Sequence, residues 1–162
     1  MRLDYINDVA GNRYIGVNIH SDVVTPYLEQ LKSIVGDEYG DYTSYQQNRD
    51  RGHHHTTVLN VMDFNKVIND KEGWAHGGIA KADFKPDYNV LTDIMKFDIE
   101  DFQTLGLGTV RKNENRTYFI VCRSNQLQGF RKKFKLEEID FHITLGFKHK
   151  DVFGLRKNEI IK

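Results

Sequence analysis

The sequence of 162 residues contains little cysteine, little proline and no long apolar run. A single cysteine, Cys122, excludes an internal disulfide framework and favours a reducing compartment. The two prolines and the absence of low-complexity segments are typical of a folded chain. No run approaches the roughly 20 apolar residues of a membrane-spanning helix, and the first residues lack the apolar segment of a signal peptide. These absences predict a soluble, cytoplasmic protein without membrane partners.

Neither sign of charge is in excess, because 23 Lys and Arg balance 23 Asp and Glu. The composition therefore provides no uniformly basic surface for long double-stranded nucleic acid. The distribution is uneven: residues 111–162 hold 13 basic and 6 acidic residues, whereas residues 1–110 hold 10 and 17. Two interpretations stay open. In one, the basic residues of 111–162 bind a small anionic ligand. In the other, the charged residues of both segments are simply solvated.

The local patterns alternate between strands and helices within one domain. Strands are predicted over 13–20, 55–61, near 91–99, near 103–111, 116–124 and 140–147, and helices over 24–36, 65–70 and 125–136. In the first helix we expect Thr25 as the N-cap, Pro26 at the first position and Gly36 at the end. The polar segment 37–52 and the segment 71–89 are predicted loops.

Three consecutive histidines lie in the interior of the sequence, in "GHHHTTVLNV", residues 52–61. Adjacent residues of a strand point to opposite faces, so one strand cannot present all three to a single metal ion. No Cys pair or H-E-x-x-H motif adds ligands. We predict no metal site and no cofactor here. The glycine-rich "FQTLGLG" (102–108) lacks the Lys-Ser/Thr ending of a phosphate-binding P-loop and is not interpreted as one.

Two short motifs repeat at equivalent places. His55-Thr56-Thr57-Val58 and His142-Ile143-Thr144-Leu145 each lie on a predicted strand that closes a strand-helix-strand unit. This repetition indicates a weak internal duplication. Residues two apart on a strand share a face, so each motif presents one imidazole and one hydroxyl together. If the two halves pack about a pseudo-twofold axis, all four side chains can face one groove.

Such a groove has the groups for acid–base chemistry on a phosphate ester. Histidine has an unperturbed pKa of about 6.5, so one imidazole can take a proton while the other gives one near neutral pH. Threonine hydroxyls can donate hydrogen bonds to phosphate oxygens. This chemistry consists of positioning and proton transfer, and it requires no metal ion.

Paired His-x-Thr-apolar motifs on the strands of two duplicated lobes resemble the 2H (two-histidine) phosphoesterase superfamily. Its members include LigT-like enzymes, RNA 2′,3′-cyclic phosphodiesterases and small viral enzymes that destroy nucleotide signals. The resemblance implies catalytic roles for His55, Thr57, His142 and Thr144. The compact chain is similar in build to the small viral members, which implies location in the host cytoplasm if the source is viral.

Three further residues are candidates for contacts with a substrate. Lys148 is an even number of residues from His142 and Thr144, so on one strand it would share their face and could contact a phosphate. The alternative is that Lys148 lies at a solvated strand end. Trp74 and Tyr45 lie on predicted loops and can stack on nucleobases, although ordinary loop packing explains both equally well.

The predicted fold class is α+β: two pseudo-symmetric lobes of antiparallel-rich sheet with backing helices around a central cleft. The lobes, approximately 1–90 and 91–162, form a single domain over 1–162. The predicted function is a metal-independent phosphodiesterase acting on small RNA-like substrates, such as cyclic oligonucleotide signals or short 2′–5′ and 3′–5′ oligonucleotides. The alternatives are an RNA 2′,3′-cyclic phosphodiesterase in RNA end processing and a non-catalytic nucleotide-binding module.

Overall fold

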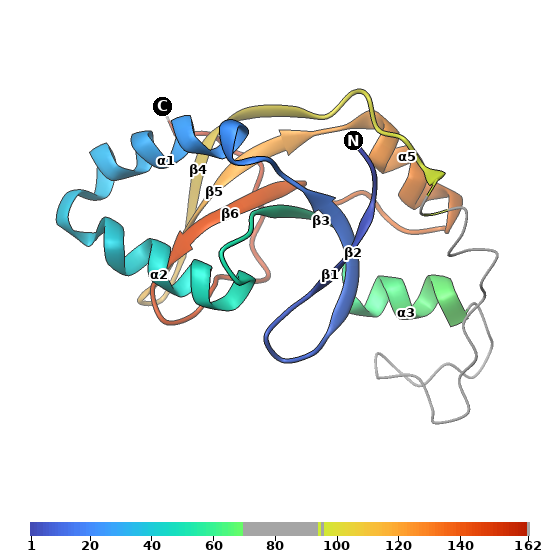
Figure 1. Ribbon diagram of the computed structural model, residues 1–162, viewed down its shortest axis with the longest axis horizontal. Coiled ribbons are helices and arrows are strands. Elements are labelled where there is room, and N and C mark those ends of the chain that lie inside the picture. The colour runs from blue at the N-terminus through green and yellow to red at the C-terminus, as the bar shows by residue number, and fades with distance from the viewer. Residues whose placement is uncertain (70–93, 95, 162) are drawn as a thin grey trace.

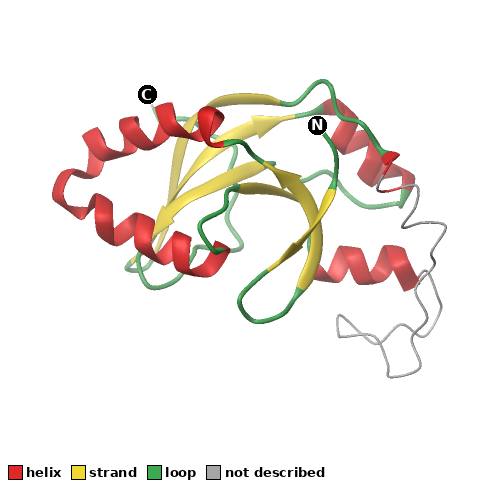
Figure 2. Ribbon diagram, viewed as in Figure 1, coloured by secondary structure: helices red, strands yellow, loops and turns green. Residues whose placement is uncertain are grey.

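The computed structural model describes residues 1–69, 94 and 96–161 of the chain (Figures 1 and 2). The strands are β1 (Asp4–Asn7), β2 (Arg13–Asn18), β3 (His55–Leu59), β4 (Gln103–Lys112), β5 (Asn115–Arg123) and β6 (His142–Phe147). The helices are α1 (Ser21–Val35), α2 (Tyr39–Asp50), α3 (Val61–Asn69) and α5 (Asn125–Lys133), with a 3₁₀ turn at Gly36–Glu38.

The six strands form one sheet in the order β1-β2-β3-β6-β5-β4, and every neighbouring pair is antiparallel. Strands from the first half of the chain lie on one side of the sheet, and strands from the second half lie on the other. The halves meet where β3 pairs with β6. Each half contributes the predicted strand-helix-strand unit, β2-α1-β3 or β5-α5-β6. The predicted α+β class with antiparallel sheet and backing helices is confirmed.

One apolar core joins the two halves. Leu31 of α1, Leu127 of α5 and Ile143 of β6 are fully buried members of the same cluster. In Figure 1, α1 and α2 lie at one end of the sheet, and α3 and α5 lie at the other. On α5, Leu127 and Phe130 are buried, and Phe134 is partly buried against the core.

Helix α1 begins earlier than the sequence predicts. Its N-cap is His20, whose Nδ1 accepts the N–H of Asp22 at 3.1 Å, so the prediction of Thr25 as the cap was wrong. Pro26 lies inside the helix and removes one hydrogen bond of the first turns. Its position is exposed, so water can satisfy the freed carbonyl. Gly36 ends the helix as predicted, with a positive φ of 57°.

The predicted loop over 37–52 is wrong, because most of this segment forms α2, which packs on β6. The buried side of α2 is mainly polar and therefore shows no apolar periodicity. Gln46 is 1% exposed and donates from Nε2 to the His53 carbonyl at 2.9 Å. Asp50 is also buried and accepts two hydrogen bonds from Arg49. These hydrogen bonds compensate the cost of burying polar groups.

Two smaller differences from the prediction concern the segment 91–99 and the start of α3. The described residues of the segment 91–99 form no strand, only an isolated bridge between Asp98 and Arg2. Helix α3 starts before the predicted residue 65, because the Asn60 side chain accepts the N–H of Asp63 at 2.8 Å and caps it. Among the described residues, no helix is both long and apolar enough to cross a membrane.

The segment after β6 runs back across the molecule and ends against β4, where the Ile161 N–H donates to the Leu107 carbonyl at 2.7 Å. Two glycines of "FQTLGLG" allow this approach. A Cβ at Gly108 would lie 2.6 Å from the Glu159 carbonyl oxygen, and one at Gly106 would lie 2.9 Å from Ile160. The glycine-rich segment therefore serves close packing of the C-terminal segment.

Candidate active site

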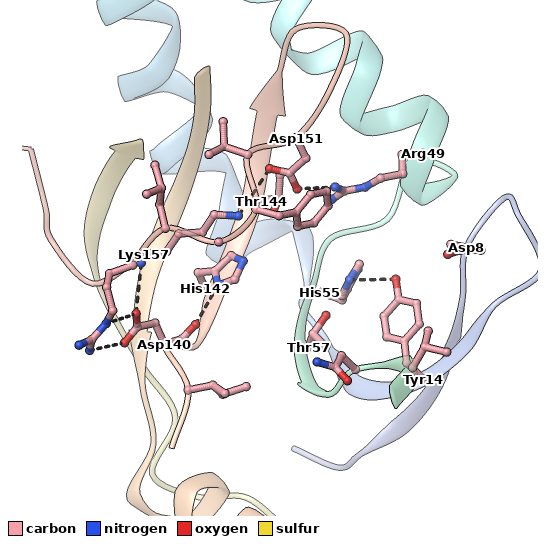
Figure 3. A pocket seen from close by; sticks show the side chains of 18 of the residues that line it. Asp8, Tyr14, Arg49, His55, Thr57, Asp140, His142, Thr144, Asp151 and Lys157 are labelled. Atoms are coloured by element: carbon pink, nitrogen blue, oxygen red, sulfur yellow. Dashed lines mark hydrogen bonds and ion pairs between the residues drawn. The ribbon is translucent and has the colours of Figure 1, made fainter. Parts of the chain in front are cut away.

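Both His-x-Thr pairs line a single cavity of about 930 Å³. Figure 3 shows His55 and Thr57 on one wall, and His142 and Thr144 on the neighbouring strand. Other parts of the lining come from β2, α2, the segment before β6 and the C-terminal segment 151–157. The structure thus brings together the four residues that the two motifs singled out.

The register of the central strands creates this arrangement. Thr56 of β3 is the direct partner of Ile143 of β6, so the middle residues of the two motifs face each other. Both are fully buried, and the flanking histidines and threonines point to the cavity face. Because the strands are antiparallel, the register places His55 beside Thr144 and Thr57 beside His142.

Each motif is followed by the same irregularity. In β3 the partner of Ile15 is Leu59, and the partner of Gly16 is Thr57, which leaves Val58 as an extra residue. In β6 the partners of Tyr118 and Phe119 are Gly146 and Thr144, which leaves Leu145 as an extra residue. Both extra residues occupy the apolar fourth position of the motif and are fully buried. They are β-bulges, which redirect a strand beside a site.

Arg131 of α5 stabilises the first bulge. Its guanidinium donates to the Val58 carbonyl at 2.7 Å and to the Asp63 carboxylate at 2.9 Å. Arg131 is only 3% exposed. It belongs to a run of basic residues that is otherwise exposed, so its structural contacts were not predicted from the sequence.

His142 is held in one tautomer. Its Nδ1 lies 2.8 Å from the Asp140 carbonyl oxygen, which can only accept, so Nδ1 carries the proton. In the neutral ring Nε2 therefore has the lone pair. Burial lowers the pKa of His142 to about 4, and the charge of Lys157 acts in the same direction. At neutral pH this imidazole is uncharged and can accept a proton.

His55 contacts a tyrosine. Its Nε2 lies 3.4 Å from the hydroxyl of Tyr14, which comes from β2. Burial raises the pKa of Tyr14 to about 12, so the hydroxyl stays protonated at neutral pH. Burial also lowers the pKa of His55, while the charge of Asp50 opposes this shift. Tyr14 lines the same cavity and was missed by the sequence reasoning.

A buried charge network borders the second motif. Asp151 receives hydrogen bonds from Arg49 at 2.5 Å and from the Thr117 hydroxyl at 2.7 Å. Lys157 lies 3.5 Å from the same carboxylate. Burial raises the pKa of Asp151, but the charges of Lys157 and Arg49 outweigh this effect and lower it below the ordinary value. Asp151 is therefore ionised at neutral pH.

The cavity also has apolar lining. Phe153 is 63% exposed and Leu155 is 44% exposed, and both belong to the C-terminal segment. An exposed aromatic ring beside a polar site offers a flat surface to a planar ligand. Sequence reasoning missed these residues because the segment 148–161 contains no regular helix or strand.

Two predicted substrate contacts lie elsewhere. Lys148 pairs with Glu38 at 2.8 Å and does not line the cavity, because the bulge at Leu145 interrupts the two-residue alternation on which its parity rested. Tyr45 belongs to α2, not to a loop, and its hydroxyl lies 2.8 Å from His149 Nδ1. The cavity lining does not support a substrate contact for either residue. Trp74 lies outside the described residues.

The three consecutive histidines take separate positions. His53 is exposed, the Nε2 of His54 is buried without a partner among the described residues, and His55 lines the cavity. Within residues 1–69, 94 and 96–161, no three His, Cys, Asp or Glu side chains are grouped to bind one metal ion.

A family model described as "Swiss Army Knife, 2H phosphoesterase domain" matches residues 14–153. The match covers most of the chain and includes both His-x-Thr motifs. The chain therefore belongs to the 2H phosphoesterase family, as the two motifs predicted, and its activity is that of a phosphoesterase, a hydrolase. The searches of curated proteins and of solved structures found no match.

Proposed function

We propose that this protein is a metal-independent phosphodiesterase that cleaves small RNA-like substrates, with cyclic oligonucleotides and short 2′–5′ or 3′–5′ oligonucleotides as the preferred class. The observation that supports it most is that both His-x-Thr pairs line one cavity. A phosphodiester held between them has an imidazole and a hydroxyl on each side.

The two histidines divide the proton transfers. His142 acts as the general base, because its protonated Nδ1 is bound to the Asp140 carbonyl and its low pKa leaves Nε2 free of a proton. It removes the proton from the attacking hydroxyl or water. His55 then protonates the leaving oxygen. The negative charge of a bound phosphate favours the protonated form of His55 that this step requires.

The threonines hold the phosphate between the histidines. Thr57 and Thr144 each lie across the strand pair from the histidine of the other motif. Their hydroxyls donate to the non-bridging oxygens and stabilise the charge that redistributes over these oxygens in the transition state. The two bulges keep both donors on the cavity face while the strands bend away beyond them.

The dimensions and lining of the cavity support a small nucleotide substrate. A volume of about 930 Å³ falls within the range of small-molecule sites. Phe153 gives an exposed aromatic surface on which a nucleobase can stack. The net charge of zero gives little affinity for long nucleic acid, whose binding depends on many Lys and Arg contacts.

A turnover panel tests this proposal. The wild-type protein and His142→Asn would be incubated in excess EDTA with a 2′,3′-cyclic mononucleotide, a 2′–5′ oligoadenylate, and 3′–5′ cyclic di- and trinucleotides. Products would be identified by chromatography. We expect hydrolysis of a cyclic or short oligonucleotide by the wild type only.

The other outcomes redirect the assignment. Preference for the 2′,3′-cyclic mononucleotide would favour RNA end processing. Tight binding of a nucleotide without turnover would make the protein a binding module. Equal turnover by His142→Asn would contradict the proposed mechanism for whichever substrate is cleaved.

A further inference from the structure

Lys157 is a buried cation with few hydrogen-bond acceptors. It lines the cavity and is 5% exposed. Among the described residues, its ammonium has one hydrogen bond, to Asp151 Oδ1 at the long distance of 3.5 Å. Its other close groups are the rings of Phe119 and Phe153, with centroids 5.9 and 5.7 Å away. An ammonium carries three N–H donors, so two have no oxygen acceptor in the described part of the chain.

The neighbouring cation has a different environment. Arg49 donates from Nε and Nη2 to Asp50 at 2.8 and 2.9 Å, and from Nη1 to Asp151. Its guanidinium is therefore held by two carboxylates.

Asp151 has short hydrogen bonds from Arg49 and Thr117 independently of Lys157. At 3.5 Å the contact with Asp151 gives the Lys157 ammonium one long hydrogen bond and leaves its other N–H groups unsatisfied by this carboxylate. Removing an ammonium from water is costly unless an acceptor replaces the lost hydration.

The position of Lys157 suggests the missing acceptor. Figure 3 shows its side chain beside His142, with the nitrogen directed towards Asp151. Burial is the main cause of the lowered pKa of His142, and the charge of Lys157 acts on it in the same direction. An anion placed between the two motifs lies within reach of the same charge.

We propose that Lys157 is a phosphate-binding residue, whose ammonium donates to a non-bridging oxygen of the phosphate held by Thr57 and Thr144. The inference rests on the proposed function and adds a third donor to the site. A charged donor forms a stronger hydrogen bond to a phosphate oxygen than a hydroxyl does. Its charge also stabilises the transition state, in which the phosphate oxygens carry the developing charge.

Binding of inorganic phosphate tests the inference without any turnover. Wild type, Lys157→Met and the exposed control Lys150→Met would be titrated with phosphate, and the NMR signals of His142 and Thr144 followed. We expect Lys157→Met to weaken phosphate binding by about 10- to 100-fold. Lys150→Met removes the same charge outside the cavity and should bind as the wild type does. Equal affinity of all three proteins would overturn the inference.

A second variant covers the case in which Lys157→Met does not fold. Lys157→Cys can be alkylated with 2-bromoethylamine, which rebuilds a side chain ending in an ammonium. The native Cys122 is buried, and burial raises its pKa to about 12, so it stays unreactive. Phosphate affinity should recover on alkylation. Unchanged affinity before and after alkylation would contradict the inference.

The outcomes separate this inference from the proposed function. Phosphate binding that depends on Lys157, without hydrolysis of any diester, would retain the phosphate site and reject the enzyme. Hydrolysis with unchanged KM, kcat and phosphate affinity in Lys157→Met would retain the enzyme and reject the role of Lys157. Failure of the wild type to bind phosphate would reject the role as well.

Discussion

Thr56 and Ile143 are direct partners across the centre of the sheet, and each is the middle residue of a His-x-Thr motif. This single pairing joins the two halves of the chain and sets the position of the four residues that flank it. A shift of one residue between β3 and β6 would turn one histidine and one threonine to the opposite face. The site therefore depends on this register as much as on the motif residues themselves.

Acidification should destabilise the protein through His142. Its pKa is about 4 in the folded chain against an ordinary value of 6.5, so the unfolded chain binds more protons in this interval. The contribution of neutral His142 to the free energy of unfolding is complete above about pH 6.5 and decreases as the pH falls towards 4. Thermal unfolding of wild type and His142→Gln across this range tests it. The variant should lose part of the dependence on pH, and identical profiles would contradict the prediction.

Arg131→Met should destabilise the fold by about 3 kcal/mol, as removal of one partner of a buried charged pair typically does. The change leaves the Val58 carbonyl and the Asp63 carboxylate without their buried donor. Lys132→Met, on the adjacent exposed position of α5, is the control. Urea denaturation of the two variants provides the comparison. Equal midpoints would show that Arg131 does not stabilise the bulge.

Gly108→Ala should loosen the C-terminal segment that lines the cavity. The new Cβ would lie 2.5 Å from the Phe119 ring and 2.6 Å from the Glu159 carbonyl oxygen. We expect a loss of about 1–3 kcal/mol from overpacking.

Gly129→Ala is the matched control, because its Cβ would have no atom within 4 Å. Within α5 this change should stabilise by about 0.5–1 kcal/mol. Denaturant unfolding of both variants measures the two effects. A stabilising Gly108→Ala would reject the close approach of the C-terminal segment to β4.

Phe153→Ala should raise the KM for a nucleotide substrate by about tenfold, since stacking of one base on an aromatic ring contributes roughly 1–3 kcal/mol. Its exposed ring lines the cavity. Because a phenyl ring cannot transfer a proton, kcat should change little. Ile34→Ala, an exposed apolar residue of α1 that does not line the cavity, controls for surface effects. Steady-state kinetics with the preferred substrate decide, and an unchanged KM would remove Phe153 from the substrate site.

The sequence predicted those parts of the site that depend on local periodicity. His55 and Thr57 share a face because strand residues alternate, and the same holds for His142 and Thr144. Most strands follow from local patterns in the same way, and Gly36 marks the end of α1 as predicted. The α+β class was predicted from the two duplicated halves and from what the resemblance to the 2H family implied.

Other parts depend on contacts between distant residues and have no local signal. The buried stripe of α2 includes Gln46 and Asp50, whose burial is possible only through hydrogen bonds, so its pattern resembles that of a loop. Asp151 is bound by Thr117, 34 residues earlier, and by Arg49, 102 residues earlier. Lys148 lost its predicted parity through a bulge that the register alone reveals.

The central claim is that the two motifs act as one acid–base site. The most direct test measures kcat/KM in excess EDTA for His55→Gln, His142→Gln and the double variant, with the preferred substrate of the panel. In each single variant kcat/KM should fall at least about 10²-fold. In the double variant it should fall little further than in the less active single variant. A single variant that retains most of the wild-type activity, or wild-type activity abolished by EDTA, would contradict the account.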